Sequence, residues 1–299
     1  MIDRRGALRA LSIPALGAFA PVLFAAERSV EPAPAVPDRS VPDLSDPAVL
    51  LEAYMRLSGA LDDRLIIWWM DGVRYGVVDA RAQALFGMKI GLFHRFYRQA
   101  DGSFKLAMFE LTYYTDLASG EMLETFDNPY TGQTDRVSHV RLGPEVRIQT
   151  RAGIARPDNP LVKDYTSSLG PALIRGDDVW IPTSVEARIK FPKPTAPEIL
   201  LSLYTTVHGT LRDALNPALI SAPCSLAFQN VLKWEPFMRM GDRPGHMMSQ
   251  AAGKKLESVD ALPADYLRIA ERMHGKYIRD PIGALERLTD QLRKPVAID

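Results

Sequence analysis

The sequence contains a single cysteine, Cys224, in 299 residues. One cysteine cannot form a disulfide within the chain, and it cannot supply the several thiolates of the usual structural zinc sites. It follows Pro223 at the start of an expected strand and has no identifiable base beside it, so we interpret it as a small buried hydrophobic residue. The fold must therefore be stabilised by packing, for which the chain is long enough.

The sequence also has a formal net charge of zero at pH 7. Lys and Arg together number 36, as do Asp and Glu, so no global field attracts nucleic acid or an anionic membrane surface. We expect no nucleic-acid partner. The charged fraction of 24% and the hydrophobic fraction of 46% are ordinary for a soluble globular protein, which favours a compact domain.

The motifs of several large enzyme classes are absent. The sequence has no P-loop, no dinucleotide fingerprint, no Gly-x-Ser-x-Gly elbow and no Cys-x-x-Cys. Its five histidines lack the i, i+4 helical spacing of a zincin site. These absences disfavour redox-cofactor and serine-hydrolase chemistry, and we predict neither a cofactor nor a metal site.

The N-terminus resembles an export signal. Arg4 and Arg5 precede an uncharged segment, residues 11–26, that is too short for a comfortable membrane span. Two arginines before a moderately apolar segment are typical of twin-arginine export. The alternative is an N-terminal helix that stays attached, but Pro14 and Pro21 would each break its hydrogen-bond ladder.

The chain is therefore expected to have three parts. They are a twin-arginine-type signal peptide, a proline-rich linker and a single β-rich domain, at residues 1–26, 27–45 and 46–299. A clean cleavage motif is missing, so the mature protein is expected to start between Glu27 and Val36. We predict a periplasmic or secreted protein with no membrane span after signal removal, and the sequence does not indicate an oligomeric state.

Local signals predict a helix followed by antiparallel strands. Asp46 is an N-cap and Pro47 a first helical residue, and leucines at helical spacing follow. An Asp-Gly turn at residues 71–72 predicts a hairpin between residues 65–69 and 74–78. A second hairpin is expected to join residues 88–98 to 104–115, and a turn at 118–120 leads to a strand over 122–126.

Alternating patterns continue in the second half of the chain. They predict three more strands over residues 179–190, 199–208 and 225–234. One C-terminal helix is expected to run from Pro263 to Gly275, and Asp280 is expected to cap another. We therefore predict a mainly β (α+β) fold, a curved antiparallel sheet or open β-barrel with an N-terminal helix and C-terminal helices, since closure protects sheet edges. Such barrels can hold one small ligand.

Several short sequence motifs, called phrases below, lie between about Asp46 and Pro281. Together they resemble the family called domain of unknown function 1838, whose members are often exported bacterial proteins. The phrases are Trp68-Trp69-Met70-Asp71-Gly72, Tyr75-Gly76-Val77, Leu85-Phe86-Gly87-Met88, Tyr113-Tyr114-Thr115-Asp116, Asn128-Pro129-Tyr130-Thr131-Gly132 and Trp234-Glu235-Pro236-Phe237-Met238-Arg239-Met240-Gly241-Asp242-Arg243-Pro244-Gly245. The resemblance implies export and little about activity. Members tend to carry a second histidine and an acid shortly after the position of His139, and this chain departs from that pattern with Val140 to Pro144.

Candidate catalytic residues come from the second hairpin. If its loop at Asp101-Gly102 has an even number of residues, His94 and Tyr113 share an apolar face, and an even next turn places Glu124 opposite Tyr113. Burial can move the pKa of a histidine and of a carboxyl towards neutrality, as general acid/base catalysis requires. Glu110 is expected on the other face, paired with Arg95. The alternative is a hydrogen-bonded core histidine and phenol.

Other candidates lie outside this hairpin. His139 and His208 are expected in the interior, and Asp242 and Arg243 form a turn that could bind a substrate carboxylate or simply lock a loop, with His246 beside it. Four large aromatic residues could line a ligand pocket or fill a core: Trp68, Trp69, Tyr75 and Trp234.

The leading hypothesis is a cofactor-independent acid/base enzyme of lyase, decarboxylase or isomerase type that acts on a small, largely apolar molecule such as a phenolic or other aromatic compound. The base would be His94 or His139, and the orienting group or acid Glu110 or Glu124. Tyr113 would donate to developing charge, and Arg243 would anchor the substrate. A periplasmic ligand-binding or carrier protein is the alternative, and a metal-dependent hydrolase is a further one. An enzyme requires at least two titratable groups within hydrogen-bond reach in one pocket.

Overall fold

The computed structural model describes residues 43–190, 198–289 and 292. The expected signal peptide and nearly all of the linker lie outside the described residues. The first described element is α1 (Pro47–Ser58), which begins where the sequence predicts because the carboxylate of Asp46 accepts a hydrogen bond from the backbone N–H of Ala48 at 2.7 Å.

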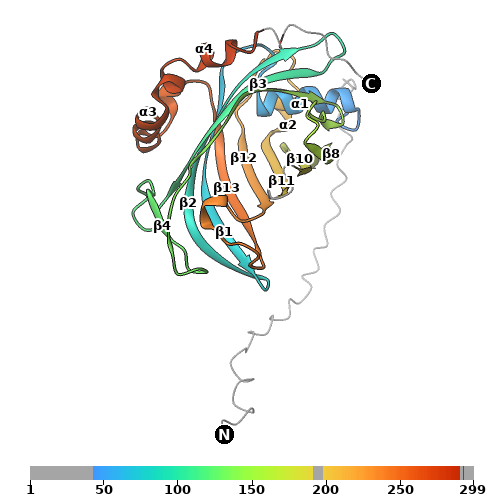
Figure 1. The fold of residues 1–299 in the computed structure, drawn as a ribbon. Helices are drawn as coiled ribbons and strands as arrows, with labels where there is room; N and C mark the ends of the chain where they lie inside the picture. Colours follow the sequence, from blue (N-terminus) through green and yellow to red (C-terminus); the bar gives the residue numbers. More distant parts are fainter. Residues whose placement is uncertain (1–42, 191–197, 290–291, 293–299) are drawn as a thin grey trace, which may run out of the picture. The chain divides into compact units, whose positions relative to one another are not determined.

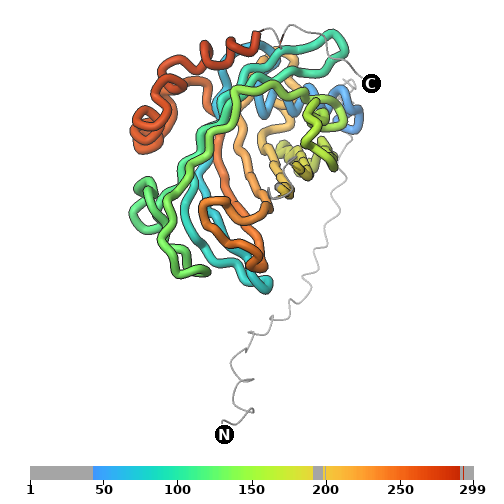
Figure 2. Tube along the Cα trace, viewed as in Figure 1, coloured from blue at the N-terminus to red at the C-terminus, as the bar shows by residue number. Residues whose placement is uncertain are grey.

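The main feature is one antiparallel sheet of eleven strands, counted over the described residues. The strands follow the order β7-β6-β3-β2-β1-β13-β12-β11-β10-β8, and β9 pairs with β10. Their bounds are β1 (Ile66–Val78), β2 (Arg81–Arg98), β3 (Phe104–Thr115), β6 (Val140–Thr150), β7 (Gly153–Ile154), β8 (Val162–Leu169), β9 (Leu173–Arg175), β10 (Asp178–Ile189), β11 (Ile199–Thr210), β12 (Ser225–Leu232) and β13 (His246–Leu256). β13, late in the chain, lies beside the early strand β1 (Figure 2).

The sheet is strongly curved and nearly closed (Figure 1). Its two end strands, β7 and β8, meet through side chains: the hydroxyl of Ser167 accepts from the N–H of Ile154 at 2.9 Å, and the hydroxyl of Tyr165 donates to the carbonyl of Ile154 at 3.0 Å. The prediction of a mainly β fold with a curved, barrel-like antiparallel sheet is confirmed.

Smaller elements complete the fold. A two-stranded sheet pairs β4 (Thr125–Asp127) with β5 (Thr134–Arg136). The remaining elements are α2 (Leu211–Ala214), η1 (Pro236–Met238), η2 (Val259–Ala261), α3 (Ala264–Arg279) and α4 (Pro281–Glu286). The carboxylate of Asp280 caps α4 as predicted, accepting from the N–H of Gly283 at 2.8 Å. None of the described helices is long and apolar enough to span a membrane.

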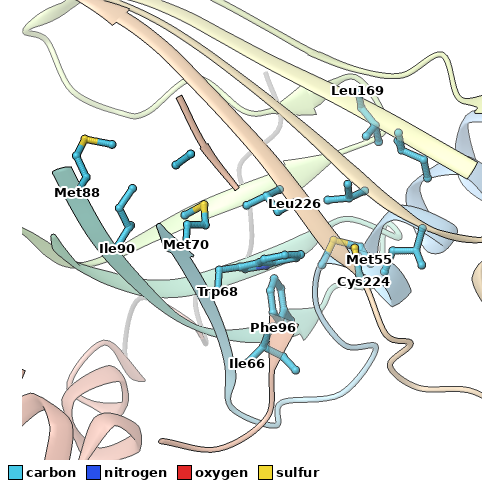
Figure 3. Packing of buried hydrophobic residues seen from close by; sticks show 14 of the residues in the cluster. Met55, Ile66, Trp68, Met70, Met88, Ile90, Phe96, Leu169, Cys224 and Leu226 are labelled. Atoms are coloured by element: carbon cyan, nitrogen blue, oxygen red, sulfur yellow. The ribbon is translucent and has the colours of Figure 1, made fainter. Parts of the chain in front are cut away.

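The curved sheet separates two hydrophobic cores. The inner core fills the concave side next to α1, where Trp68, Met70, Phe96 and Cys224 pack with Met55 of the helix (Figure 3). Burial raises the pKa of the Cys224 thiol to about 12, which fits its interpretation as a small hydrophobic residue. The outer core lies between the convex side of β1–β3 and the helices α3 and α4, which form the C-terminal helical layer that the sequence predicts.

The first predicted hairpin is wrong in its turn. β1 continues through Asp71 and Gly72, and the chain reverses at Asp79 and Ala80, whose φ angles are 50° and 59°. This two-residue turn with positive φ matches the twist of the flanking strands. Gly72 serves a different purpose, because a Cβ there would lie 2.2 Å from the carbonyl oxygen of Gln250 in the neighbouring strand β13.

The second hairpin is confirmed, but its register differs from the prediction by one residue. The N–H of Gln99 donates to the carbonyl of Ser103 at 2.9 Å, so the loop between them has an odd number of residues. His94 therefore lies opposite Met108, and Tyr113 lies opposite Lys89. Because side chains alternate between faces, this shift puts His94 on the inner face and Tyr113 on the outer face.

Other segments differ in their extent. The strand expected at residues 122–126 is reduced to β4 and to a single bridge between Met122 and Thr115. The helix α3 continues beyond Gly275 to Arg279, with a non-helical φ of −142° at His274. The three later strands are confirmed as β10, β11 and β12, whereas β6, β8 and β13 were not predicted.

Candidate active site in the sheet interior

A buried polar network lies on the concave face of the sheet. Arg74 of β1 donates from Nη2 to the hydroxyl of Tyr114 at 3.0 Å and forms an ion pair with Glu235 at 3.0 Å. The Tyr114 hydroxyl donates to the same Glu235 oxygen at 2.7 Å. Nη1 of Arg74 donates to the Asn230 side-chain oxygen at 3.2 Å. Three titratable groups thus lie within hydrogen-bond reach of one another in the interior.

Strand register explains why these residues meet. Arg74 is the direct partner of Ser249 on β13, which is the direct partner of Asn230 on β12. Direct partners in an antiparallel sheet point to the same face, so the three side chains form a row on the concave side. Their residues are 5%, 0% and 9% exposed, respectively, so the row is shielded from bulk solvent.

Two donors in this row have no hydrogen-bond partner within the described part of the chain, namely Nε of Arg74 and the hydroxyl of Ser249. Leaving a buried donor unpaired costs about 1–3 kcal/mol. Such groups are rare in folded proteins and each requires an explanation. Both donors belong to neighbouring residues of a single row.

The same row becomes apolar as it crosses the sheet. Asn230 is the direct partner of Leu203 on β11, and Leu203 is the direct partner of Val185 on β10. Both side chains are only half-buried, as is Phe228 in the adjacent row. The concave face therefore presents buried polar groups beside a partly accessible apolar surface, which suits a small molecule with one polar end.

A second set of interior groups lies along β3. Glu110, Thr112 and Tyr114 alternate on the concave face, and the Thr112 hydroxyl donates to the Glu110 carboxylate at 2.6 Å. Burial raises the pKa of Glu110, and the positive charges of Arg147 and Arg74 partly oppose this effect. The predicted pairing of Glu110 with Arg95 is wrong, because the two side chains lie on opposite faces. Arg95 instead forms ion pairs with Asp63 at 2.6 Å and Glu286 at 3.1 Å.

His94 also faces the interior. Burial, aided by the positive charge of Arg147, lowers the pKa of His94 to about 3, so the imidazole is neutral at neutral pH. Its ring stacks on Phe96 with a centroid distance of 5.7 Å, and its Nδ1 has no hydrogen-bond partner in the described residues. His94 is thus a neutral imidazole in the interior, on β2, the strand that pairs with the Glu110 strand β3.

The expected grouping of His94, Tyr113 and Glu124 is wrong. Tyr113 is on the outer face, where its hydroxyl lies 2.9 Å from Nδ1 of His274. The Glu124 side chain is 73% exposed and points towards Arg272 at 3.8 Å. The one-residue register shift separates His94 from Tyr113, and the strand expected to carry Glu124 back across Tyr113 is reduced to the bridge at Met122 and to β4.

Of the other predicted histidines, His139 borders the interior network through Tyr114, whereas His208 and His246 lie away from it. His139 is half-buried, and its Nδ1 accepts from the backbone N–H of Tyr114 at 3.1 Å. Its ring centroid lies 6.0 Å from that of Tyr114, and burial lowers its pKa. His208 was expected inside but lies on the outer face, stacked on Trp180 and 2.9 Å from Asp178. His246 is exposed.

The four candidate aromatic residues do not form one wall. Trp68 points inward and donates from Nε1 to the carbonyl of Ser58 at 2.7 Å, whereas Trp69 and Tyr75, at odd positions of β1, point outward. The rings of Trp234 and Tyr130 pack in a tilted arrangement, with centroids 5.1 Å apart and planes at 54°, and both cover the inner face of Gly76. Beside Tyr130 lies a surface hollow of about 480 Å³.

Asp242 and Arg243 lie in an exposed turn. The backbone N–H of Arg243 donates to the carbonyl of Met240 at 3.2 Å, and its Nη1 donates to the same carbonyl at 3.4 Å. These contacts stay within the turn, and neither Asp242 nor Arg243 belongs to the interior network. Among the described residues, no group of three or more His, Cys, Asp or Glu side chains is placed to hold a metal ion.

One comparison with known proteins identifies the family. The family described as "Protein of unknown function (DUF1838)" matches residues 62–168 and 181–288. The chain belongs to the DUF1838 family. No curated protein and no solved structure matches the sequence.

Sequence reasoning on this DUF1838 protein did not select Arg74, Ser249, Asn230 or Glu235. A signal was present for two of them: Glu235 lies in the longest family phrase, and Arg74 lies between the phrases Trp68–Gly72 and Tyr75–Val77. An arginine at an inward position of a mostly apolar strand would have indicated a buried partner. Ser249 and Asn230 carried no such signal, because their importance depends on strand pairing.

Proposed function

We propose that this protein is a cofactor-independent acid/base enzyme of lyase, decarboxylase or isomerase type. Its substrate would be a small, largely apolar molecule, phenolic or otherwise aromatic, bound against the concave face of the sheet. The observation that carries the proposal is the Tyr114 hydroxyl, which lies 2.7 Å from Glu235 and 3.0 Å from Arg74 in the interior. Positioned proton donors and acceptors of this kind accelerate proton transfer.

Glu235 is the best candidate for the base. Its side chain is 13% exposed, against 6% for that of Arg74, so it is the more accessible member of the ion pair. Arg74 and Tyr114 both bind one oxygen of this carboxylate, which fixes its orientation. Burial raises the pKa of Tyr114 far above its usual value, so its phenol stays protonated and acts as a hydrogen-bond donor.

Glu110 is the candidate for a second proton-transfer group. Its raised pKa increases the share of the protonated acid at neutral pH, as a general acid requires. Glu110 and Tyr114 are four residues apart on one strand, which corresponds to roughly 13 Å. A molecule bound along β3 could therefore contact both groups. His94, neutral and on the adjacent strand, would contribute hydrogen bonding within the same interior.

The alternative function is ligand binding without turnover, as in a carrier protein. It is favoured by one specific observation: Tyr114 is fully buried and its hydroxyl is already hydrogen-bonded to two partners, as expected of a structural network. In that case the half-buried apolar side chains of β10–β12 would hold the ligand, and the Arg74 network would only shape the floor of the site.

The test is a turnover assay with matched variants. Purified protein is incubated with aromatic acids, aromatic ketones and phenolic compounds, with and without a chelator, and new masses are followed by mass spectrometry. We expect turnover that is insensitive to the chelator, lost in Glu235→Gln and reduced in Glu110→Gln. The control Glu121→Gln changes a carboxylate that is 65% exposed and should leave turnover unchanged.

Two results would contradict the proposal. Ligand binding without any new mass would favour the carrier, and turnover that stops with chelator would favour a metal-dependent hydrolase. Turnover that survives in Glu235→Gln would place the base elsewhere. Because glutamine has nearly the same shape as glutamate, a denaturation curve of each variant separates loss of chemistry from loss of fold.

We also propose that the protein acts outside the cytoplasm, after export by the twin-arginine route. The proposal is supported by Arg4, Arg5 and the uncharged segment that follows them. Cell fractionation tests it: the full chain should be found in the periplasm or medium, and Arg4→Lys combined with Arg5→Lys should retain it in the cytoplasm. Equal export of both chains would contradict the twin-arginine route.

A further inference from the structure

We infer that the substrate is a neutral carbonyl compound, whose oxygen binds to Nε of Arg74 and the hydroxyl of Ser249 while Glu235 removes a proton from the adjacent carbon. The inference rests on the proposed acid/base function and specifies its substrate class. Its basis is the pair of buried donors, on directly paired residues, that have no partner among the described residues.

The two donors belong to directly paired residues whose side chains lie on the same face. Directly paired residues of an antiparallel sheet have Cβ atoms about 4.5–5.5 Å apart, and Arg74 and Ser249 are such a pair on the concave face. An acceptor that receives both hydrogen bonds would satisfy the buried donors. A carbonyl oxygen has two lone pairs and meets this requirement.

Charge favours a neutral carbonyl over a carboxylate. Glu235 already compensates the positive charge of Arg74 through their contact at 3.0 Å. A bound carboxylate would add a second negative charge beside Glu235 in a buried place, which is unfavourable because like charges repel strongly where the dielectric constant is low. A neutral carbonyl adds no charge on binding.

The reaction step conserves the charge of the cluster. The C–H bond next to the carbonyl breaks, and its proton bonds to the Glu235 carboxylate. The electron pair of that bond forms a carbon–carbon double bond, and the π electrons of the carbonyl move to oxygen. The negative charge thus moves from Glu235 to an oxygen that faces the same guanidinium, as transition-state stabilisation requires.

The row of residues also fits the rest of such a molecule. Beyond Asn230, the row continues with Leu203 and Val185, which are half-buried and apolar. Strands lie about 4.8 Å apart, so an apolar body attached to the carbonyl would extend over these side chains. The polar end of the row binds the reacting group, and the apolar end binds the remainder.

The experiment measures hydrogen exchange next to a ketone. Acetophenone, propiophenone and cyclohexanone are each incubated with the full protein in D₂O, and loss of the proton signal at the carbon next to the carbonyl is followed by NMR. Removal of a proton by Glu235, followed by return of a deuteron from solvent, requires no other reactant. We expect exchange faster than in buffer for at least one ketone.

Variants assign the step to the site. Glu235→Gln should abolish the enzymatic exchange, and Ser249→Ala should slow it about 100–1000-fold, the range seen when one donor to a developing oxyanion is removed. Ser249→Ala should not lower stability, because the hydroxyl has no partner to lose among the described residues. Ser225→Ala, at an exposed serine of β12, is the matched control and should exchange like the natural protein.

The outcomes separate this inference from the proposed function. If the turnover assay finds Glu235-dependent conversion of compounds without a carbonyl group, and no ketone exchanges, the substrate class is wrong and the acid/base function stands. If neither assay shows Glu235-dependent chemistry, both fail. Exchange that is unaffected by Ser249→Ala, or competition by benzoate stronger than that by the ketones, would also overturn the inference.

Discussion

Tyr113 and Tyr114 are consecutive residues whose hydroxyl groups lie on opposite faces of the sheet. The Tyr114 hydroxyl points inward and donates to Glu235 at 2.7 Å, whereas the Tyr113 hydroxyl points outward, 2.9 Å from Nδ1 of His274. The two tyrosines therefore belong to two separate polar clusters, one on each face of the sheet. Only the inner cluster can contact a molecule bound on the concave face.

The first prediction concerns the buried ion pair. Arg74→Met should lower the free energy of unfolding by about 3–5 kcal/mol, because it leaves the Glu235 carboxylate without its charged partner in a buried place. The double variant Arg74→Met with Glu235→Leu should recover part of this loss, since no uncompensated charge remains. Urea denaturation of the natural protein, of Arg74→Met and Glu235→Leu alone, and of the double variant measures the difference. Additive losses would contradict a coupled pair.

Local signals were sufficient to predict elements but not their pairing. Asp46 and Pro47 define the start of α1 within one turn of helix, so the prediction held. The register of β2 and β3 depends on whether the loop has an odd or even number of residues, which is decided by the conformation around Gly102, at a φ of 84°. Because the loop differs by one residue from the predicted length, Tyr113 lies on the opposite face of the sheet from His94, not on the same face as predicted.

The candidate site was harder to predict because its parts come from distant segments. Arg74, Tyr114 and Glu235 lie on different strands and loops, and β13, which carries Ser249, was not predicted at all. Its alternation is weakened by Gly253 and by the two alanines before it. Without that strand, no sequence argument could place Arg74 beside Asn230.

The second prediction is a pH dependence caused by His94. Burial lowers its pKa to about 3 from a value of 6.5 in the unfolded chain. As the pH falls below 6.5, the unfolded chain binds a proton that the folded protein does not, so the free energy of unfolding should decrease by up to about 1.4 kcal/mol per pH unit until about pH 3. Above pH 6.5 this contribution is constant.

His94→Phe removes this contribution, so the stability of the variant should depend less steeply on pH between about 3 and 6.5. Urea denaturation at several pH values gives the two slopes. His208→Gln is the control, because His208 is exposed on the outer face. Equal slopes for His94→Phe and the natural protein would show that His94 takes up its proton in the folded state as well.

The third prediction tests the corrected position of the first turn. Ala80 has a φ of 59°, a left-handed conformation that costs a residue with a Cβ about 1–2 kcal/mol. Ala80→Gly should therefore raise the free energy of unfolding by about 0.5–1 kcal/mol, after the greater freedom of glycine in the unfolded chain is subtracted. Ala82→Gly, two residues along in β2, should lower it. Stabilisation by both variants would contradict a turn at Asp79-Ala80.

The fourth prediction concerns the outer cluster. Burial, together with the positive charges of Arg141 and Lys276, lowers the pKa of His274. Arg141→Gln removes one of these charges and should raise the pKa of His274, as measured from its imidazole NMR signals during a pH titration. The control Arg268→Gln removes an exposed charge that pairs with Glu121 and should leave that pKa unchanged. If both variants shift the pKa equally, the long-range field of the protein rather than Arg141 controls His274. Because this cluster lies on the outer face, Arg141→Gln should also leave ketone exchange unchanged, which separates the two clusters functionally.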